Sequence, residues 1–141
     1  MAIFVDENTK VVVQGLTGGQ GTYHGLRNRD YGTQIVAGVT PGKAGQDVDG
    51  IPIFDTVEDA IAATGATASF VVVPPKFAAG AILDAAKAGI EFIVCITEGI
   101  PAQDEAKVYN TLVRDHPGTR LLGPNCPGII SPGKCNIGIT A

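Results

Sequence analysis

Short runs of apolar, largely β-branched residues recur along this chain and alternate with stretches that carry apolar residues at helical spacing. Continuous apolar runs of four to eight residues are typical of strands buried on both faces of a parallel sheet. The pattern predicts strands over seven segments: Lys10–Leu16, Thr33–Thr40, Ile51–Phe54, Ala68–Val73, Glu91–Ile96, Thr119–Leu122 and Asn136–Thr140.

The segments between these strands carry helix start and stop signals. Thr56 is suited to the N-cap of one helix, and Gly65 to its left-handed end. Two later helices, over Lys76–Ala88 and from Pro101 to Pro117, each show an apolar stripe that predicts a buried face. The first stripe comprises Phe77, Ala81, Ile82, Ala85 and Ala86, and the second comprises Val108, Tyr109, Leu112 and Val113.

Alternation of strands and helices at this spacing favours βαβ units with right-handed crossovers. We therefore expect an α/β fold with a Rossmann-like, doubly wound and mostly parallel sheet, covered by helices on both faces. The length of 141 residues suits one domain, which we place over residues 1–141. Residues 123–134 are too rich in proline and glycine for a helix.

Composition narrows the classes of function. Hydrophobic residues make up 45% of the chain and charged residues 17%, which excludes general disorder. The net charge of −4 favours neither nucleic acid nor a membrane surface as a partner. Three cysteines show no metal-ligand spacing, so we expect reduced thiols and no metal site. No signal peptide is apparent, so we expect a cytoplasmic protein, or a mitochondrial matrix protein if a transit peptide has been removed.

A glycine-rich turn follows the first predicted strand. Residues 14–22 read QGLTGGQGT, which places glycines in a G-x-x-G-x-x-G pattern with one extra glycine. In the first turn of a doubly wound sheet, such glycines allow a tight turn and a close approach of backbone N–H groups to a phosphate. The helix that follows adds the positive end of its dipole. The turn therefore predicts a phosphate or nucleotide site.

The end of the second predicted strand narrows the choice of nucleotide. NAD-binding domains usually carry an Asp or Glu there to hold the ribose hydroxyls. This chain has Pro41 and Lys43 instead. A lysine suits a phosphate on the ribose, as in NADP or coenzyme A, although it would also suit a solvated loop. The residues alone leave these alternatives open.

Ile96, Thr97 and Glu98 follow another strand, at the edge where ligands bind. A carboxylate near a helix start favours a simple capping role for Glu98, and the alternative is that it orients a group from another segment. His24 and His116 lack an acid or nucleophile partner in the sequence, so we interpret both as structural. Cys126 fits a buried small residue.

Six blocks of the chain, in order, resemble the start of succinyl-CoA synthetase (succinate–CoA ligase) α subunits. They are KVVVQGLTGGQGTYH (10–24), VTPGKAG (39–45), VPPKF (73–77), ITEGIP (96–101), GPNCPG (123–128) and PGKCNIGI (132–139). The resemblance implies an amino-terminal, coenzyme A-binding domain of an acid–thiol ligase that couples the interconversion of succinyl-CoA and succinate plus CoA to nucleoside triphosphate synthesis.

The resemblance also implies which residues contact the coenzyme. The implied set is Thr17, Gly18, Gly19, Gln20, Pro41, Lys43, Ile96, Thr97, Glu98 and Asn125. The glycine loop would contact the phosphates, Lys43 a phosphate, and Ile96–Glu98 the pantetheine end. Glu98 would support a phosphohistidine loop, in place of the capping role. Gly19 stands where some members have a serine, which removes a hydroxyl.

The resemblance places the catalytic histidine in a second domain and the nucleotide-grasp region in a separate β subunit, so this chain alone is not expected to be active. Two alternatives remain at this stage. One is a stand-alone CoA-binding regulatory module, and the other is an NADP-binding Rossmann domain.

Overall fold

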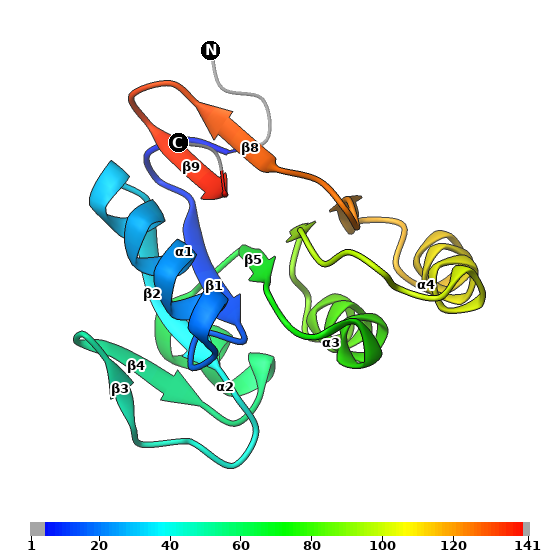
Figure 1. Ribbon diagram of the computed structural model, residues 1–141, viewed down its shortest axis with the longest axis horizontal. Coiled ribbons are helices and arrows are strands. Elements are labelled where there is room, and N and C mark those ends of the chain that lie inside the picture. The colour runs from blue at the N-terminus through cyan, green and yellow to red at the C-terminus, as the bar shows by residue number, and fades with distance from the viewer. Residues whose placement is uncertain (1–4, 140–141) are drawn as a thin grey trace.

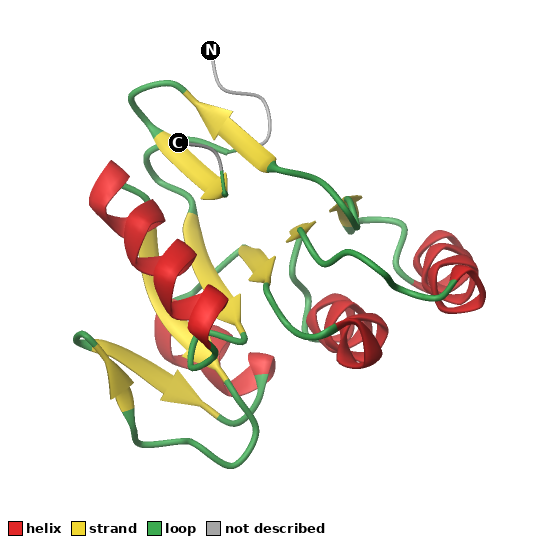
Figure 2. Cartoon of the chain, in the orientation of Figure 1, coloured by secondary structure: helices red, strands yellow, loops and turns green. Residues whose placement is uncertain are grey.

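A computed structural model describes residues 5–139. Seven strands form one sheet in the order β3-β4-β2-β1-β5-β6-β7, and all neighbouring pairs are parallel except β3 with β4 (Figures 1 and 2). The strands are β1 (Lys10–Gln14), β2 (Gln34–Val39), β3 (Asp47–Val48), β4 (Ile51–Phe54), β5 (Ala68–Val71), β6 (Phe92–Cys95) and β7 (Arg120–Leu122). Because the chain grows outward from β1 in one direction and then from β5 in the other, the strand order reverses between these two strands. The predicted doubly wound fold is confirmed.

Different elements pack against the two faces of the sheet. On one face lie α1 (Gly19–Tyr31) and a hairpin of β8 (Gly128–Ser131) and β9 (Cys135–Gly138), and β9 packs against α1. On the other face lie α2 (Val57–Thr64), α3 (Pro75–Lys87) and α4 (Ala102–Asp115), and α3 contacts both other helices (Figure 1). The core accordingly divides into two clusters of buried side chains, one on each face.

The predicted signals for α2 are confirmed in detail. The Thr56 side chain accepts a hydrogen bond of 3.1 Å from the Asp59 N–H, and Gly65 ends the helix with φ of 74°. A threonine before the first turn and a glycine after the last one therefore set both ends of this helix.

Two predicted core stripes are partly wrong. In α3, Ile82, Ala85 and Ala86 are buried with Ala78, but Phe77 is 57% exposed and Ala81 is only half-buried. In α4, Val108 and Leu112 are buried, whereas Tyr109 and Val113 are exposed. Each helix lies against the sheet with a narrower face than its apolar residues suggest, and this leaves Phe77 free to border a cavity.

The hairpin near the end of the chain is only partly predicted. β9 begins one residue earlier than expected and ends at Gly138, and residues 140 and 141 lie outside the described range. β8 was not predicted, nor was the two-residue strand β3. The hairpin is held by Thr33, whose hydroxyl donates to the Asn136 carbonyl at 2.7 Å and accepts from the Asn136 N–H at 2.8 Å. These bonds join residues far apart in sequence, which a local pattern does not reveal.

Candidate functional site

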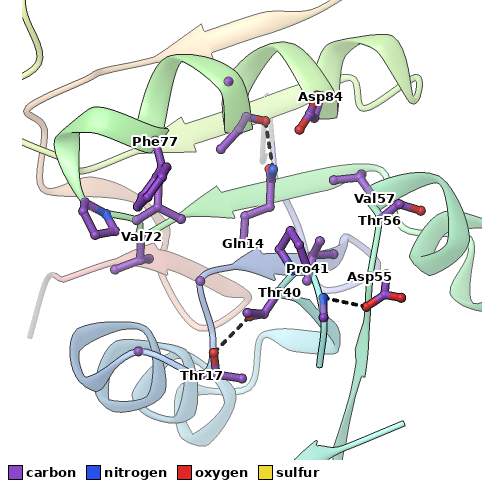
Figure 3. Close-up of a pocket in the computed structure, with 18 of the residues that line it drawn as sticks. Gln14, Thr17, Thr40, Pro41, Asp55, Thr56, Val57, Val72, Phe77 and Asp84 are labelled. Carbon is purple, nitrogen blue, oxygen red and sulfur yellow. Dashed lines mark hydrogen bonds between the residues drawn. The ribbon is translucent and has the colours of Figure 1, made fainter. Parts of the chain in front are cut away.

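A cavity of about 1030 Å³ opens at the carboxyl ends of β1 and β2, between the start of α2 and one side of α3 (Figure 3). It lies beside the reversal of strand order, where doubly wound sheets bind ligands. Its lining consists of Gln14, Gly15, Thr17 and Gly18, residues 39–42, residues 55–58, residues 72–74, and the α3 residues Lys76, Phe77, Gly80, Ala81, Asp84 and Lys87.

Two glycines of the turn after β1 are required by close packing. A Cβ on Gly15 would overlap the Val72 carbonyl, and the φ of Gly15 is 98°, a value that side chains disfavour. A Cβ on Gly21 would overlap the Gly15 carbonyl. These contacts bring α1 close to the ends of β1 and β5, so both glycines shape the turn.

The head of α1, meaning the N-cap Gly18 and the first-turn residues Gly19, Gln20 and Gly21, is open. A Cβ added to Gly19 would meet no atom within 4 Å. Gly18 provides no side-chain cap, and the first turn holds no acidic residue. The first helical bond runs from the Thr22 N–H to the Gly18 carbonyl, so the N–H groups of the first turn have no partner within the helix. Such a head is suited to an anion.

Three hydrogen bonds fix polar side chains that line the cavity. The hydroxyls of Thr17 and Thr40 lie 3.0 Å apart and share a hydrogen bond, which joins the glycine turn to the end of β2 (Figure 3). Gln14 is buried, donates to the Ala81 carbonyl at 2.8 Å and accepts from the Ser69 hydroxyl at 2.5 Å. Gln14 thus fixes α3 against β1, because its buried amide finds its partners there.

The loop after β2 carries Pro41 and Lys43. Pro41 lines the cavity, whereas Lys43 is exposed and lies outside the lining. The Asp55 carboxylate accepts hydrogen bonds from the N–H groups of Gly42 and Ala44, on either side of Lys43, at 2.9 and 3.2 Å. The loop is therefore bound to the end of β4, and Lys43 projects from an anchored turn.

The segment after β6 forms a second group of predicted residues, outside the cavity lining. Thr97 is buried, and its hydroxyl donates to the Val73 carbonyl at 2.9 Å. The Thr97 carbonyl accepts from the Asn125 N–H at 3.0 Å. Ile96 is half-buried and Glu98 is exposed. Because Val73 also lines the cavity, the Thr97 hydrogen bond connects this group to its edge.

The capping role for Glu98 is wrong. The helix α4 begins at Ala102, its N-cap is Pro101, and the acidic residues of its first turn are Asp104 and Glu105. Glu98 precedes the N-cap by three residues and is exposed, so its carboxylate remains available to another segment.

The structure divides the predicted site residues into three sets. Thr17, Gly18 and Pro41 line the cavity; Ile96, Thr97, Glu98 and Asn125 gather beyond β6; Gly19, Gln20 and Lys43 are exposed and outside the lining.

The sequence did not identify Asp55 or the α3 wall as part of the site. The α3 wall comprises the lining residues Lys76, Phe77, Gly80, Ala81, Asp84 and Lys87. Phe77 was assigned to the core, although it follows β5, the strand at which the order reverses. Because ligands bind where the strand order reverses, the position of Phe77 just after β5 was the sequence signal for a place in the site. Lys76 lies over the Phe77 ring, with its Nζ 4.9 Å from the ring centroid.

The thiols and His24 show no sign of activation. Burial raises the pKa of Cys95 and of Cys126, so both thiols stay protonated at neutral pH. Cys126 is half-buried, and not buried as predicted, and its thiol donates to the Cys95 carbonyl at 3.4 Å. Burial and then the Arg27 guanidinium lower the pKa of His24, which keeps that ring neutral. Neither these two thiols nor the His24 ring is therefore activated as a nucleophile.

Within residues 5–139, no group of three or more His, Cys, Asp or Glu side chains is arranged to hold a metal ion. Across the same residues, no helix combines the length and the apolar character needed to cross a membrane.

Comparison with curated proteins shows close relatives. The chain is 54% identical over 139 residues to the succinate–CoA ligase [ADP-forming] subunit alpha of Aquifex aeolicus, covering 99% of this chain and 46% of that protein. It is 58% identical over 139 residues to subunit alpha 2 of Archaeoglobus fulgidus, covering 99% and 48%. The chain thus spans about half the length of these relatives.

The fold recurs in solved structures. ATP citrate lyase from Methanothrix soehngenii, in complex with citrate and coenzyme A, superposes with a TM-score of 0.77 at 22% identity, covering 96% of this chain and 24% of that one. At this identity the likeness shows the fold alone, and it agrees with the doubly wound sheet described above.

A family model, described as the CoA binding domain, matches residues 6–99. The match covers the glycine turn, the Lys43 loop, the α3 wall and the segment up to Glu98, and the implied coenzyme A family is confirmed. An uncapped helix head beside a cavity at the strand-order reversal is the geometry that a phosphate-bearing ligand needs. This chain belongs to the CoA binding domain family.

Proposed function

We propose that this chain forms the coenzyme A-binding part of a succinate–CoA ligase α subunit. Identities of 54% and 58% to α subunits over 139 residues support the proposal. The full protein would interconvert succinyl-CoA and succinate plus CoA, coupled to nucleoside triphosphate synthesis. The chain would supply the coenzyme site of that acid–thiol ligase.

The open head of α1 is the observation that carries the proposal. It combines first-turn N–H groups that have no partner within the helix, the positive end of a helix dipole and a first turn without acidic residues. A pyrophosphate with its negative charges fits this arrangement. The adjoining cavity of about 1030 Å³ has room for the rest of a nucleotide, because ligand pockets usually measure roughly 300–1000 Å³.

The positions of these three sets of predicted residues suggest a direction for the coenzyme. We place the pyrophosphate at the head of α1, the ribose phosphate beside Lys43, and the pantetheine along the Val73–Thr97 contact toward Glu98. The thiol end would then leave the site beyond β6, at the group that contains Glu98 and Asn125.

Glu98 is positioned to act on a neighbouring segment. Its carboxylate is exposed and does not cap α4. We propose that it supports a phosphohistidine loop from a second domain, and that a β subunit completes the ligase with the nucleotide-grasp region. In that assembly this chain binds and orients the coenzyme, and the phosphoryl group is carried elsewhere.

Calorimetric titration of the chain with CoA, 3′-dephospho-CoA and NADPH tests the proposal. We expect CoA to bind most tightly, 3′-dephospho-CoA to bind more weakly because it lacks the phosphate next to Lys43, and NADPH to bind more weakly than CoA. NADPH binding tighter than CoA, or no CoA binding at all, would contradict the proposal.

A further inference from the structure

The loop from Thr40 to Gln46 uses all its backbone donors internally. Pro41 has no N–H, and the other six N–H groups donate within the chain. Thr40 and Gly45 donate to carbonyls of β4, Lys43 and Gln46 donate within the loop, and Gly42 and Ala44 donate to Asp55. The cationic donor that this loop retains for a ligand is therefore the Lys43 ammonium.

Asp55 supplies the side-chain acceptor for these loop N–H groups, and the other acceptors are backbone carbonyls. A single carboxylate oxygen, Oδ1, accepts from Gly42 at 2.9 Å and from Ala44 at 3.2 Å, so it holds both neighbours of Lys43 (Figure 3 shows the Gly42 bond). Asp55 follows β4 directly and lines the cavity. The carboxylate thus links the position of the Lys43 turn to a strand of the sheet.

The negative charge of Asp55 disfavours binding of an anionic ligand, whereas its hydrogen bonds to the Lys43 turn favour binding. A carboxylate at the cavity wall repels a phosphate, and this repulsion weakens as salt increases. Its two hydrogen bonds meanwhile keep the Lys43 turn ordered before any ligand arrives, which lowers the entropy cost of binding. Two properties of one side chain therefore act in opposite directions: the acceptor favours binding, and the charge opposes it.

We propose that Asp55 is a positioning residue for the 3′-phosphate of coenzyme A, acting through the turn that carries Lys43. This inference rests on the proposed function, because it takes coenzyme A as the ligand. The acceptor atom of Asp55 sets the turn, and Lys43 contacts the phosphate.

Two substitutions separate the acceptor from the charge. Asp55→Asn keeps an oxygen that can accept from Gly42 and Ala44 but removes the charge. Asp55→Ala removes both. We expect Asp55→Ala to weaken CoA binding about threefold to tenfold, the range for loss of a net hydrogen-bond contribution. We expect Asp55→Asn to tighten CoA binding about twofold to threefold at low salt.

Asp47→Ala is the matched control. The Asp47 carboxylate also holds an exposed turn, by accepting from the Gly50 N–H at 2.9 Å, and it lies outside the cavity lining. The control removes the same charge and the same kind of hydrogen bond, so we expect CoA affinity within about twofold of the parent.

Titration of each variant with CoA and with 3′-dephospho-CoA measures the effect on the 3′-phosphate. The dissociation constant of 3′-dephospho-CoA divided by that of CoA should shrink in Asp55→Ala and be kept or enlarged in Asp55→Asn. A merely structural defect would weaken the binding of both ligands equally and leave this ratio unchanged. An unchanged ratio in Asp55→Ala, or weaker CoA binding by Asp55→Asn, overturns the inference. If Asp55→Ala does not fold, Asp55→Asn decides alone. Failure of the parent chain to bind CoA would instead remove the proposed function.

Discussion

Of the helix heads that border the cavity, those of α1 and α2 differ both in capping and in first-turn charge. The head of α2 is capped by the Thr56 hydroxyl, and Glu58 and Asp59 occupy its first turn. The head of α1 has a glycine N-cap, no side-chain cap and no acidic residue. At the head of α2, a side-chain cap and two carboxylates from the chain complement the N–H groups and the helix dipole. At the head of α1, the chain supplies neither.

On the proposed function, this contrast would give a nucleotide in the cavity one orientation. Anions are stabilised where N–H groups are unpaired and are repelled where carboxylates already occupy the helix head. The phosphates of coenzyme A should therefore approach α1, and the less charged parts should lie toward α2 and α3. We therefore expect local capping chemistry, more than the overall charge of −4, to direct the ligand.

The largest effect should come from closing the α1 head. Gly18→Asp would give α1 a charged N-cap like those that stabilise other helices. A Cβ at Gly18 lies 3.4 Å from the Gly15 carbonyl and the φ of Gly18 is −75°, so the backbone tolerates the side chain. We expect CoA affinity to fall at least about tenfold, while stability stays equal or rises by a few tenths of a kcal/mol.

Calorimetry and urea unfolding of Gly18→Asp check both halves of that prediction. Gly18→Asn adds a cap without charge and should lose less affinity than Gly18→Asp. Gly118→Asp is the control for net charge, because it adds an acid in open space at the other end of the sheet. Unchanged CoA binding by Gly18→Asp would show that the phosphates lie elsewhere.

Opening the α2 head should affect mainly stability. Thr56→Ala removes the hydrogen bond from the Asp59 N–H and should lower the free energy of unfolding by about 1 kcal/mol, measured by urea unfolding. CoA affinity should change far less than in Gly18→Asp, because the first-turn acids Glu58 and Asp59 remain. A loss of affinity as large as that of Gly18→Asp would mean that α2, and not α1, holds the anion.

A smaller, pH-dependent difference should arise from His24 of α1. Burial and Arg27 lower its pKa from the usual 6.5, so the unfolded chain binds this proton more readily than the folded chain. Its contribution to stability is therefore complete above pH 6.5 and is lost as the pH falls toward the lower, folded-state pKa. Urea midpoints at pH 7.5 and 5.5 should differ less in His24→Gln than in the parent. Equal differences in both proteins would exclude this role for His24.

The sequence predicted features that depend on local patterns. Apolar runs located the main strands because a buried parallel strand is apolar on both faces, and Thr56 and Gly65 marked the ends of α2. Tertiary features were missed. Phe77 is as apolar as a core residue and borders a cavity, β8 depends on pairing across a turn, and Asp55 acts on a loop more than ten residues before it.

Binding of the phosphates at the α1 head is tested most directly by titrating the isotope-labelled chain with CoA and following the backbone amide resonances. We expect the largest shifts at Gly19, Gln20 and Gly21 of the α1 head. Amides of residues 57–59 in α2 should shift little, because that head is capped and acidic. Large shifts at the α2 head with an unperturbed α1 head would show that the α1 head does not bind the phosphates.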